Sequence, residues 1–482
     1  MFPGSFTIWH LLVAVYLIYG TDAATIDQSK QLGINSTNVT ASSCPMLGVI
    51  PPTPNARPTG AMYVGYYESW SDPTASNLCL VPTYYNIVIL SFVNPNFKYT
   101  KGSMDISQTG FDFLPSASAN LKNGIAILRS RGTRVLVSAG GWCYSVDGDS
   151  TCKAGGISPS KTSWAVFDPK DTRYSPAQYS QSLQNLKDFV DDFGLDGVDI
   201  DFETNGYPSS MSSAANCQPS NGGGSWVPPG TNLTQTCGAD PQYINIINQF
   251  RSAFPKPYLL SSAVHGYGAY GEGIYDNVHM APGWGGLWWN GGMSLGMLKA
   301  SGNKLDWLNV MSYDANTYWN PATRTYAVNP NNNNVNVGFF DPTTALLAYK
   351  QYFSGPILVG IEPPMEGFPA DQPSTPCHLG HCLTIEELKY LLGFISSQNA
   401  GGIMIWAIQK QPQPQYAAYP DPNTISKQVC TFFNWSNCQA TFPLGSAVST
   451  ASTRRNPIPN CGVNSLNCSK SFSDKDVSIG PF

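Results

Sequence analysis

The sequence predicts an α/β protein with the architecture of a TIM (β/α)8 barrel, and two observations support this. Short apolar runs alternate with segments of helical periodicity over roughly 350 residues. Several of these runs are apolar at nearly every position, which is typical of parallel strands covered on both faces. With 482 residues, the chain is long enough for one such barrel and small additions.

The expected strands of the barrel are eight apolar runs bounded by turn residues. They cover residues 62–70, 84–93, 134–142, 195–203, 258–264, 305–314, 356–361 and 402–407. Apolar residues at helical spacing predict helices between the strands. These helices cover residues 116–131, 176–193, 243–254, 343–353 and 384–397. Thr384 and Glu387 form a capping-box pattern at the start of the last helix.

Two long strand-to-helix connections are expected to wall a cleft. They cover residues 204–238 and 265–292 and leave the C-terminal ends of the fourth and fifth strands. Chemistry in a TIM barrel lies at that end of the strands. We therefore look for the site there.

The fourth expected strand, residues 195–203, carries three acids on one face and apolar residues on the other. Because side chains of a strand alternate, Asp199, Asp201 and Glu203 point the same way. Such closely spaced carboxyl groups cannot all ionise cheaply, so at least one should keep its proton toward neutral pH. A protonated carboxyl group is what a glycosidic oxygen needs in order to leave.

Two other interpretations of this strand are weaker. A solvated charged strand would not carry so apolar an opposite face. A calcium loop would need glycine and oxygen ligands at the positions that apolar residues occupy here.

The run DGVDIDFE, residues 196–203, resembles the DGxDxDxE signature of family 18 glycoside hydrolases, the chitinase family, on barrel strand four. Residues 138–141 resemble the SxGG motif of strand three, and residues 311–314 resemble the MxYD motif of strand six. Tyr66 and Trp406 match the tyrosine of strand one and the tryptophan of strand eight. The resemblance covers residues 60–435, with the fragments in barrel order.

The resemblance implies a role for each residue that matches a motif. Glu203 would be the general acid and then the general base, while Asp201 would hold the N-acetyl group of the substrate and Asp199 would share its proton. Tyr313 would hydrogen-bond the acetamide, and Asp196 would be structural. The residues expected to line the sugar site are Tyr66, Gly140, Gly141, Trp142, Met311, Asp314 and Trp406.

The resemblance also implies backbone features and one departure. Non-proline cis peptides are expected at Ser91–Phe92 and Trp406–Ala407. Residues 262–265 lack the proline-containing pattern of some members, which affects subsite detail rather than the reaction. Whether His265 contacts substrate or is structural stays open.

The function that these features imply is that of a secreted retaining chitinase, which hydrolyses β-1,4 bonds between N-acetylglucosamine units. The acetamide oxygen of the substrate would be the nucleophile, so neither metal nor cofactor is expected. Members with a deep cleft carry an extra insertion between strands seven and eight. Here only residues 362–401 lie there, so we expect no large insertion domain, an open cleft and endo-type cutting.

Two alternatives use the same barrel. One is a catalytically silent chitin-binding lectin, although such proteins usually lack the acid glutamate that Glu203 supplies here. The other is an endo-β-N-acetylglucosaminidase acting on N-glycans, which would use the same residues.

Composition limits the partners and suggests the compartment. A net charge of −5, with 12% charged residues, gives no basic stripe for nucleic acid and no polybasic patch for a membrane. We expect a monomer whose partner is chitin or N-acetyl-chitooligosaccharides. Residues 1–23 resemble a secretory signal peptide, which predicts a protein outside the cell or in the cell wall.

The remaining segments flank the catalytic barrel, which we expect to span residues 60–435. Residues 24–59 are expected to be a flexible glycosylated leader, and residues 436–482 a cysteine-containing polar tail. Five N-glycosylation sequons begin at Asn35, Asn38, Asn232, Asn434 and Asn467.

The chain has 12 cysteines, which fits disulfides in an oxidising compartment. Proximity in sequence suggests the pairs Cys44–Cys79, Cys143–Cys152, Cys217–Cys237, Cys377–Cys382, Cys430–Cys438 and Cys461–Cys468. The cysteines and histidines of residues 377–382 are therefore expected to form a disulfide loop rather than a metal site. The GxGxxG run at residues 266–271 is not followed by a helix, so it does not predict a dinucleotide site.

Overall fold

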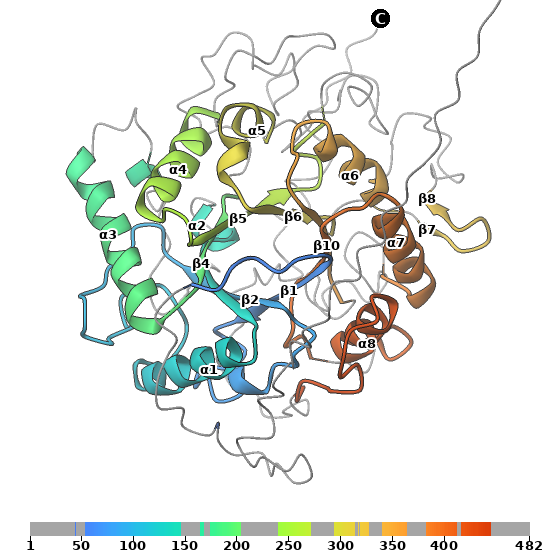
Figure 1. Cartoon of the computed structure of the whole chain (residues 1–482), viewed down its shortest axis with the longest axis horizontal. Coiled ribbons are helices and arrows are strands. Elements are labelled where there is room, and N and C mark those ends of the chain that lie inside the picture. The colour runs from blue at the N-terminus through green and yellow to red at the C-terminus, as the bar shows by residue number, and fades with distance from the viewer. Residues whose placement is uncertain are drawn as a thin grey trace, which may run out of the picture. The chain divides into compact units, whose positions relative to one another are not determined.

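Eight parallel strands form a closed barrel in the order β1-β10-β9-β6-β5-β4-β3-β2 (Figure 1). The structure is a computed structural model that describes residues 44, 54–145, 164–167, 174–203, 240–270, 294–313, 317, 319–326, 340–363, 382–411 and 416–444. The barrel strands are β1 (Met62–Glu68), β2 (Ile87–Val93), β3 (Arg134–Gly140), β4 (Gly197–Asp201), β5 (Leu259–His265), β6 (Trp307–Met311), β9 (Ile357–Ile361) and β10 (Gly402–Ile405). Seven of them lie within a predicted strand and β5 extends one residue beyond its predicted end, so the predicted barrel is confirmed.

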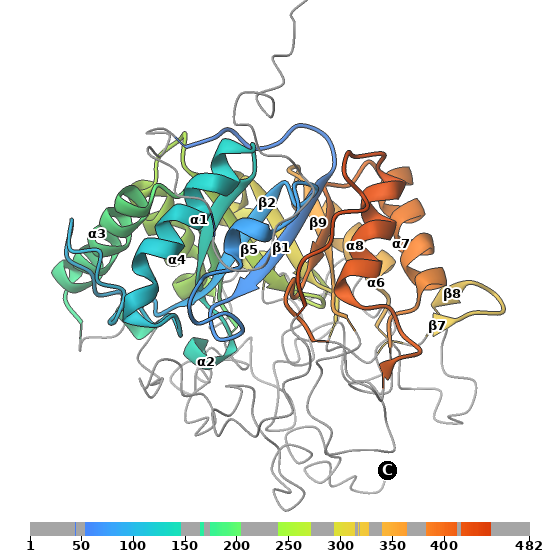
Figure 2. The ribbon, with the colours of Figure 1, turned by 90° about the horizontal axis from the view of Figure 1, so that it is seen from below.

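Helices lie outside the strands, as Figures 1 and 2 show from two directions. They are α1 (Ser118–Ser130), α3 (Pro176–Phe193), α4 (Asp240–Ala253), α5 (Leu295–Ser301), α6 (Pro342–Lys350), α7 (Ile385–Ser397) and α8 (Pro422–Phe432). The five predicted helices are confirmed as α1, α3, α4, α6 and α7. The sequence analysis did not predict α5, α8 or the two-stranded sheet of β7 (Trp319–Asn320) and β8 (Thr325–Tyr326).

Side-chain caps explain where several helices begin. Asp341 and Asp421 accept hydrogen bonds from main-chain amides at the start of α6 and α8. Thr384 accepts a hydrogen bond from the main-chain amide of Glu387 at the start of α7. The Glu387 carboxylate accepts a hydrogen bond from the Tyr326 hydroxyl at 2.8 Å, which joins α7 to β8.

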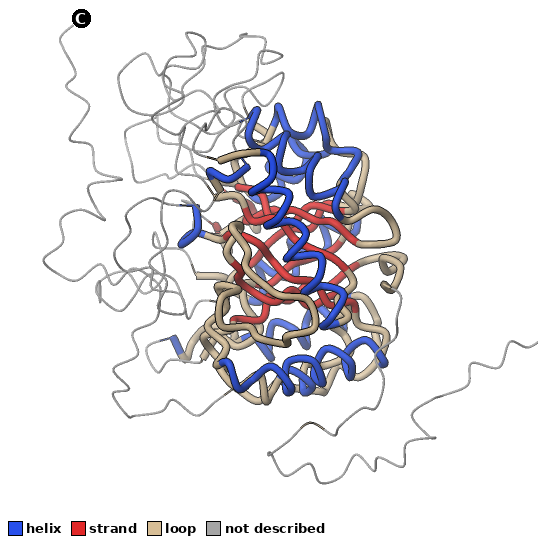
Figure 3. Tube along the Cα trace, turned by 90° about the vertical axis from the view of Figure 1, so that its left-hand side faces the viewer, coloured by secondary structure: helices blue, strands red, loops and turns tan. Residues whose placement is uncertain are grey.

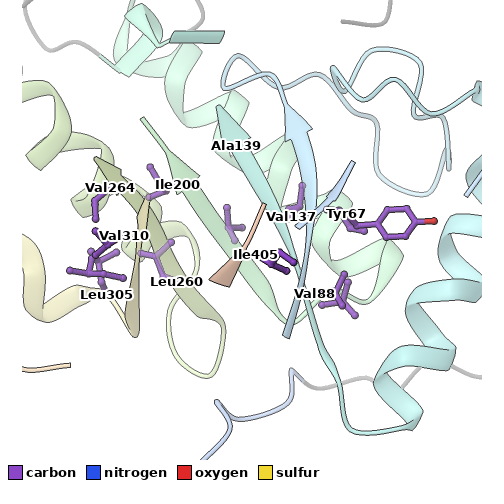
Figure 4. Packing of buried hydrophobic residues seen from close by; sticks show 14 of the residues in the cluster. Tyr67, Val88, Val137, Ala139, Ile200, Leu260, Val264, Leu305, Val310 and Ile405 are labelled. Carbon is purple, nitrogen blue, oxygen red and sulfur yellow. The ribbon is translucent and has the colours of Figure 1, made fainter. Parts of the chain in front are cut away.

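The apolar core has two layers. The larger cluster lies between the barrel and the helices, and Figure 4 shows part of it, with Ile200 of β4 and Val137 of β3 among its members. The smaller cluster includes Met62, Tyr66 and Trp307. Figure 3 shows the helices outside the strands. Along β1, alternate residues belong to different clusters, with Tyr63 in the larger one and Met62 and Val64 in the smaller one.

A buried ion pair lies at the N-terminal ends of β3 and β4. Arg129 Nε lies 3.1 Å from Asp196 Oδ1, and both side chains are buried. Asp196 also accepts hydrogen bonds from the main-chain amides of Val135 and Asn55. Asp196 is therefore structural, as expected, and residues near Asn55 contact this end of the barrel.

Covalent and backbone features agree with several predictions. The disulfides Cys44–Cys79 and Cys430–Cys438 are formed as predicted. Cys143 and Cys382 are also disulfide-bonded, whereas their predicted partners and the other two predicted pairs lie outside the described residues. The peptides Ser91–Phe92 and Trp406–Ala407 are both cis, as expected.

A membrane-spanning helix would have to be both long and apolar. None of the helices in the described ranges meets both conditions.

Candidate active site

The predicted acids lie at the C-terminal end of β4. Asp199 and Asp201 are buried, with 0% and 3% of their surface exposed. Glu203 follows two residues beyond Asp201 and is half-buried. Between them, Ile200 and Phe202 pack in the outer apolar cluster. The alternation of the strand therefore directs the acids away from the helices, as predicted.

Asp199 is surrounded by hydrogen-bond donors. Its Oδ2 accepts from Tyr66 and Ser138, each at 2.8 Å. Its Oδ1 accepts from Ser261 at 2.6 Å and from Asn309 at 3.3 Å. Burial raises the pKa of Asp199, and these hydrogen bonds, led by that of Ser261, oppose the rise. Four donors favour the charged form of this carboxyl group.

Asp201 has a different environment. Its Oδ1 is buried and accepts no hydrogen bond within the described part of the chain. Its pKa lies well above the ordinary value because of burial, then the charge of Glu203 and then that of Asp199. The expectation that one carboxyl group of this strand keeps its proton toward neutral pH therefore points to Asp201.

Aromatic side chains gather beside the acids. The ring centroid of Trp406 lies 5.4 Å from that of Phe92 in a stacked arrangement, and 5.6 Å from that of Tyr66 edge-on. Trp70 lies 6.0 Å from Trp406. Because Trp406 and Trp70 are only half-buried, they leave flat aromatic surface accessible, which suits the apolar face of a sugar ring.

The glycine pair after β3 lets the backbone approach Asp201 closely. Gly140 has φ +110° and Gly141 has φ +82°. The main-chain amide of Gly141 donates to the Asp201 carbonyl at 2.9 Å. A Cβ on Gly141 would stand 2.6 Å from the Phe92 ring. These two predicted site residues thus position the neighbours of the site through their backbone.

The other predicted site residues lie at the same end of the barrel. Trp142 begins the short helix α2 (Trp142–Ser145) and is half-buried. Met311 ends β6, and Tyr313 follows it. Both are half-buried and pack against the smaller apolar cluster together with Trp406. Asp314 lies outside the described residues, as do 204–238 and 271–292 of the two long connections.

His265 is the last residue of β5 and lies largely inside the protein. Burial lowers its pKa to about 4, so the imidazole is neutral near pH 7. Its main-chain carbonyl accepts a hydrogen bond from the Tyr349 hydroxyl at 2.7 Å.

The described ranges bring together no group of three or more histidine, cysteine, aspartate or glutamate side chains that could hold a metal ion. Residues 377–381 of the cysteine–histidine segment lie outside those ranges.

Three important neighbours of the site were missed from the sequence. Ser261 of β5 and Asn309 of β6 are polar residues, and both are fully buried. A buried polar residue at an inward position was the signal that could have found them. Phe92 was expected only as one residue of a cis peptide. Its ring gave no signal of a place beside the acids, because aromatic residues are common in core strands.

Comparisons with known proteins agree with this geometry. The model of the family "Glycosyl hydrolases family 18" matches residues 62–340. Chitinase D of Niallia circulans is 25% identical over 452 residues, which cover 89% of this chain and 70% of that protein. Chitinase Chi52 of Paenibacillus xylanexedens is 25% identical over 412 residues, which cover 80% of this chain and 64% of that protein.

Solved structures with a similar fold include the Group IV chitinase of Ostrinia furnacalis. It is 13% identical, with a TM-score of 0.47 over 78% of this chain and 100% of that one. The family 18 chitinase of Pseudoalteromonas aurantia is 18% identical, with a TM-score of 0.41 over 72% of this chain and 94% of that one. On the family match, which spans more than half of the sequence, this chain belongs to family 18 of the glycosyl hydrolases.

Proposed function

We propose that this protein is a secreted chitinase, which hydrolyses β-1,4 linkages between N-acetylglucosamine units with retention of configuration. One observation supports this most directly. A buried carboxyl oxygen of Asp201 lacks a hydrogen-bond partner within the described residues, two positions before Glu203. An amide N–H of the substrate would supply the missing partner, and an N-acetyl group carries one.

In the first step, Glu203 donates a proton to the glycosidic oxygen while the acetamide oxygen of the substrate attacks the anomeric carbon. The bond to the leaving sugar breaks, and a cyclic cation forms from the acetamide and the sugar ring. Asp201 accepts the hydrogen bond of the acetamide N–H, and Tyr313 donates to the acetamide oxygen. In the second step, Glu203 removes a proton from water while the water oxygen attacks the anomeric carbon. The bond between that carbon and the acetamide oxygen breaks, which restores the N-acetyl group.

The charges of the three acids fit this sequence of steps. Repulsion between Asp201 and Glu203 contributes to the raised pKa of Asp201, so the pair can hold one proton near neutral pH. When that proton is on Glu203, it is available to the leaving oxygen. Asp201 is then negative and stabilises the cation, while the donors around Asp199 keep its own charge in place.

Secretion and endo-type cutting are parts of the same proposal. Secretion is supported by the sequence of residues 1–23 and by the disulfides in the barrel. Endo-type cutting is supported by the short interval between β9 and β10, residues 362–401, in which α7 takes 13 residues.

Three incubations test the function. The proposed enzyme releases soluble N-acetyl-chitooligosaccharides from colloidal chitin and leaves the N-glycans of a glycoprotein intact. Release of N-glycans with no action on chitin would indicate the endo-β-N-acetylglucosaminidase. Binding to chitin without any product from N-acetyl-chitohexaose would indicate the lectin.

A further inference from the structure

A second buried ion pair, between β1 and the segment after β10, lies beside the site. Lys410 Nζ lies 2.9 Å from Glu68 Oε1, and both side chains are 0% exposed. β1 and β10 are neighbours in the closed barrel. Because burying two charges is costly, apolar residues in such a place often serve stability equally well. Stability alone therefore gives no reason for this pair.

Its neighbour suggests another role. Lys410 Nζ lies over the Trp406 ring, 4.9 Å from the centroid. A cation within about 6 Å of an indole centroid is attracted by the ring, more strongly when water is excluded. Trp406 is one of the residues expected to line the sugar site, and it lies among the aromatic side chains beside the acids. The lysine therefore lies where its charge can hold that indole in one orientation.

Glu68 is itself held in place. Its Oε2 accepts a hydrogen bond from Ser71 at 2.6 Å. The Gln409 side chain accepts from the Glu68 main-chain amide at 2.7 Å and donates to the Glu68 carbonyl at 3.0 Å. The carboxylate of Glu68 is therefore held by Ser71, and its main chain is joined to Gln409, the residue before the lysine.

Two other pairs serve as a contrast. The buried pair Arg129–Asp196 lies at the opposite end of the barrel, away from the aromatic residues. Lys187 also lies over a ring, 4.5 Å from the centroid of Tyr258, and pairs with Asp191. That lysine lies on α3 and is partly exposed, with 21% of its side chain accessible.

We propose that Lys410, held by Glu68, is a positioning residue for Trp406 and thereby sets the affinity for the sugar bound there. The proposal rests on the proposed function in one respect, because it needs a sugar against the indole. It extends the site to two residues that touch no substrate themselves.

The decisive variant is the double substitution Glu68→Gln with Lys410→Met. It removes the cation over the indole together with the carboxylate that pairs with it, so the melting temperature should stay near that of the unchanged protein. We expect the KM for N-acetyl-chitohexaose to rise about fivefold, which is the change in affinity that corresponds to the free energy of one cation–π contact. The matched control, Lys187→Met with Asp191→Asn, removes a cation over Tyr258 and leaves the KM unchanged.

A second pair of variants shows whether the effect passes through Trp406. In a Trp406→Ala background, the double substitution has no further effect on the KM, because the indole that Lys410 orients is gone. An equal fold-change in both backgrounds would overturn the proposal, as would an unchanged KM in the folded double variant.

Lys410→Arg keeps both the cation and the ion pair. It tests the role of the cation if the double variant does not fold. Its KM should stay within about twofold of that of the unchanged protein, since a guanidinium also binds an aromatic face. A fivefold rise at an unchanged melting temperature would contradict the role of the cation.

Hydrogen–deuterium exchange of residues 406–411 tests positioning without any substrate. Exchange should be faster in the double variant than in the unchanged protein, and unchanged in the Lys187→Met control. If the protein neither binds nor cleaves N-acetyl-chitohexaose, the proposed function fails, and this measurement still decides whether Lys410 holds Trp406. Equal exchange in the folded double variant would show that it does not.

Discussion

A methyl group on Gly140 would overlap the main-chain carbonyl oxygen of Asp201, because the end of β3 lies directly against the end of β4. Gly140 also has φ +110°, a conformation that residues with a side chain rarely adopt. The position of Asp201 thus depends on a residue that has no side chain.

Gly140→Ala should therefore lower kcat, and by more than an alanine at another glycine with a positive φ would. The alanine must displace the backbone of Asp201, and a shift of about 1 Å can cost about a hundredfold in rate. The measurement is kcat on N-acetyl-chitohexaose.

Gly132→Ala is the matched control for that change. Gly132 also has a positive φ, +88°, but a Cβ there would meet nothing within 4 Å. Its stability should fall by about 1–2 kcal/mol while kcat stays the same. A Gly140→Ala variant as active as this control would show that the close contact does not position Asp201.

Ser261→Ala should move the acid limb of the pH–rate profile to higher pH. Ser261 donates to Asp199 at 2.6 Å, and this bond is the strongest of those that oppose the effect of burial on the pKa of Asp199. Without it, that pKa rises further, and the ion is lost at a higher pH. The measurement is kcat/KM against pH.

Ser262→Ala is the neighbouring control. Its hydroxyl donates to the main-chain carbonyl of Ile200 at 2.7 Å rather than to an acid. Its acid limb should coincide with that of the unchanged protein. If the acid limb of kcat/KM is the same in both variants and in the unchanged protein, the ionisation of Asp199 does not set that limb.

Asp201→Asn should abolish most activity and make the protein more stable at neutral pH. The pKa of Asp201 is raised in the folded protein, so the folded state binds its proton more tightly than the unfolded state does. The contribution of Asp201 to the free energy of unfolding is therefore fully present below the ordinary pKa of 3.8. It is lost as the pH rises through the raised pKa of the folded protein.

The melting temperatures of both proteins, measured from roughly pH 3 to pH 8, test this effect. The difference in favour of Asp201→Asn should be small at the acid end and grow as the pH rises. An Asp201→Asn protein that melts below the unchanged protein at neutral pH would contradict the assigned environment of Asp201.

The barrel and the acids of β4 could be predicted because they follow local patterns. Apolar runs bounded by turn residues mark the strands, and the two-residue period of a strand places Asp199 and Asp201 on one face. The two cis peptides and the position of Trp406 followed from the family resemblance, not from local physics.

Other parts of the site depend on how the barrel closes. Ser261 and Asn309 reach Asp199 only because β5 and β6 take their particular register beside β4. Glu68 and Lys410 meet because the first strand pairs with the last. Such contacts join residues far apart in the chain, and no periodicity within one segment encodes them.

The missed helices have simpler causes. α5 has only 7 residues, too few for a clear helical period. α8 begins with Asp421 as N-cap and Pro422 in its first turn. This pair is a recognisable helix-start signal in the sequence.

Glu203→Gln should lower hydrolysis of chitin by at least about two orders of magnitude, because the amide cannot donate the proton that the leaving oxygen needs. Binding to chitin should persist, since the shape of the side chain is kept. Glu386→Gln, an exposed glutamate of α7, is the control and should keep full activity. Near-normal hydrolysis by Glu203→Gln would show that Glu203 is not the acid.

The central claim is that the nucleophile belongs to the substrate. Attack by the acetamide oxygen inverts the anomeric carbon once, and attack by water inverts it again, so the configuration is retained. Proton NMR of N-acetyl-chitohexaose products, recorded before mutarotation, reports the anomer at the new reducing end. Attack by the acetamide oxygen predicts the β-anomer first, and an initial α-anomer would contradict this mechanism.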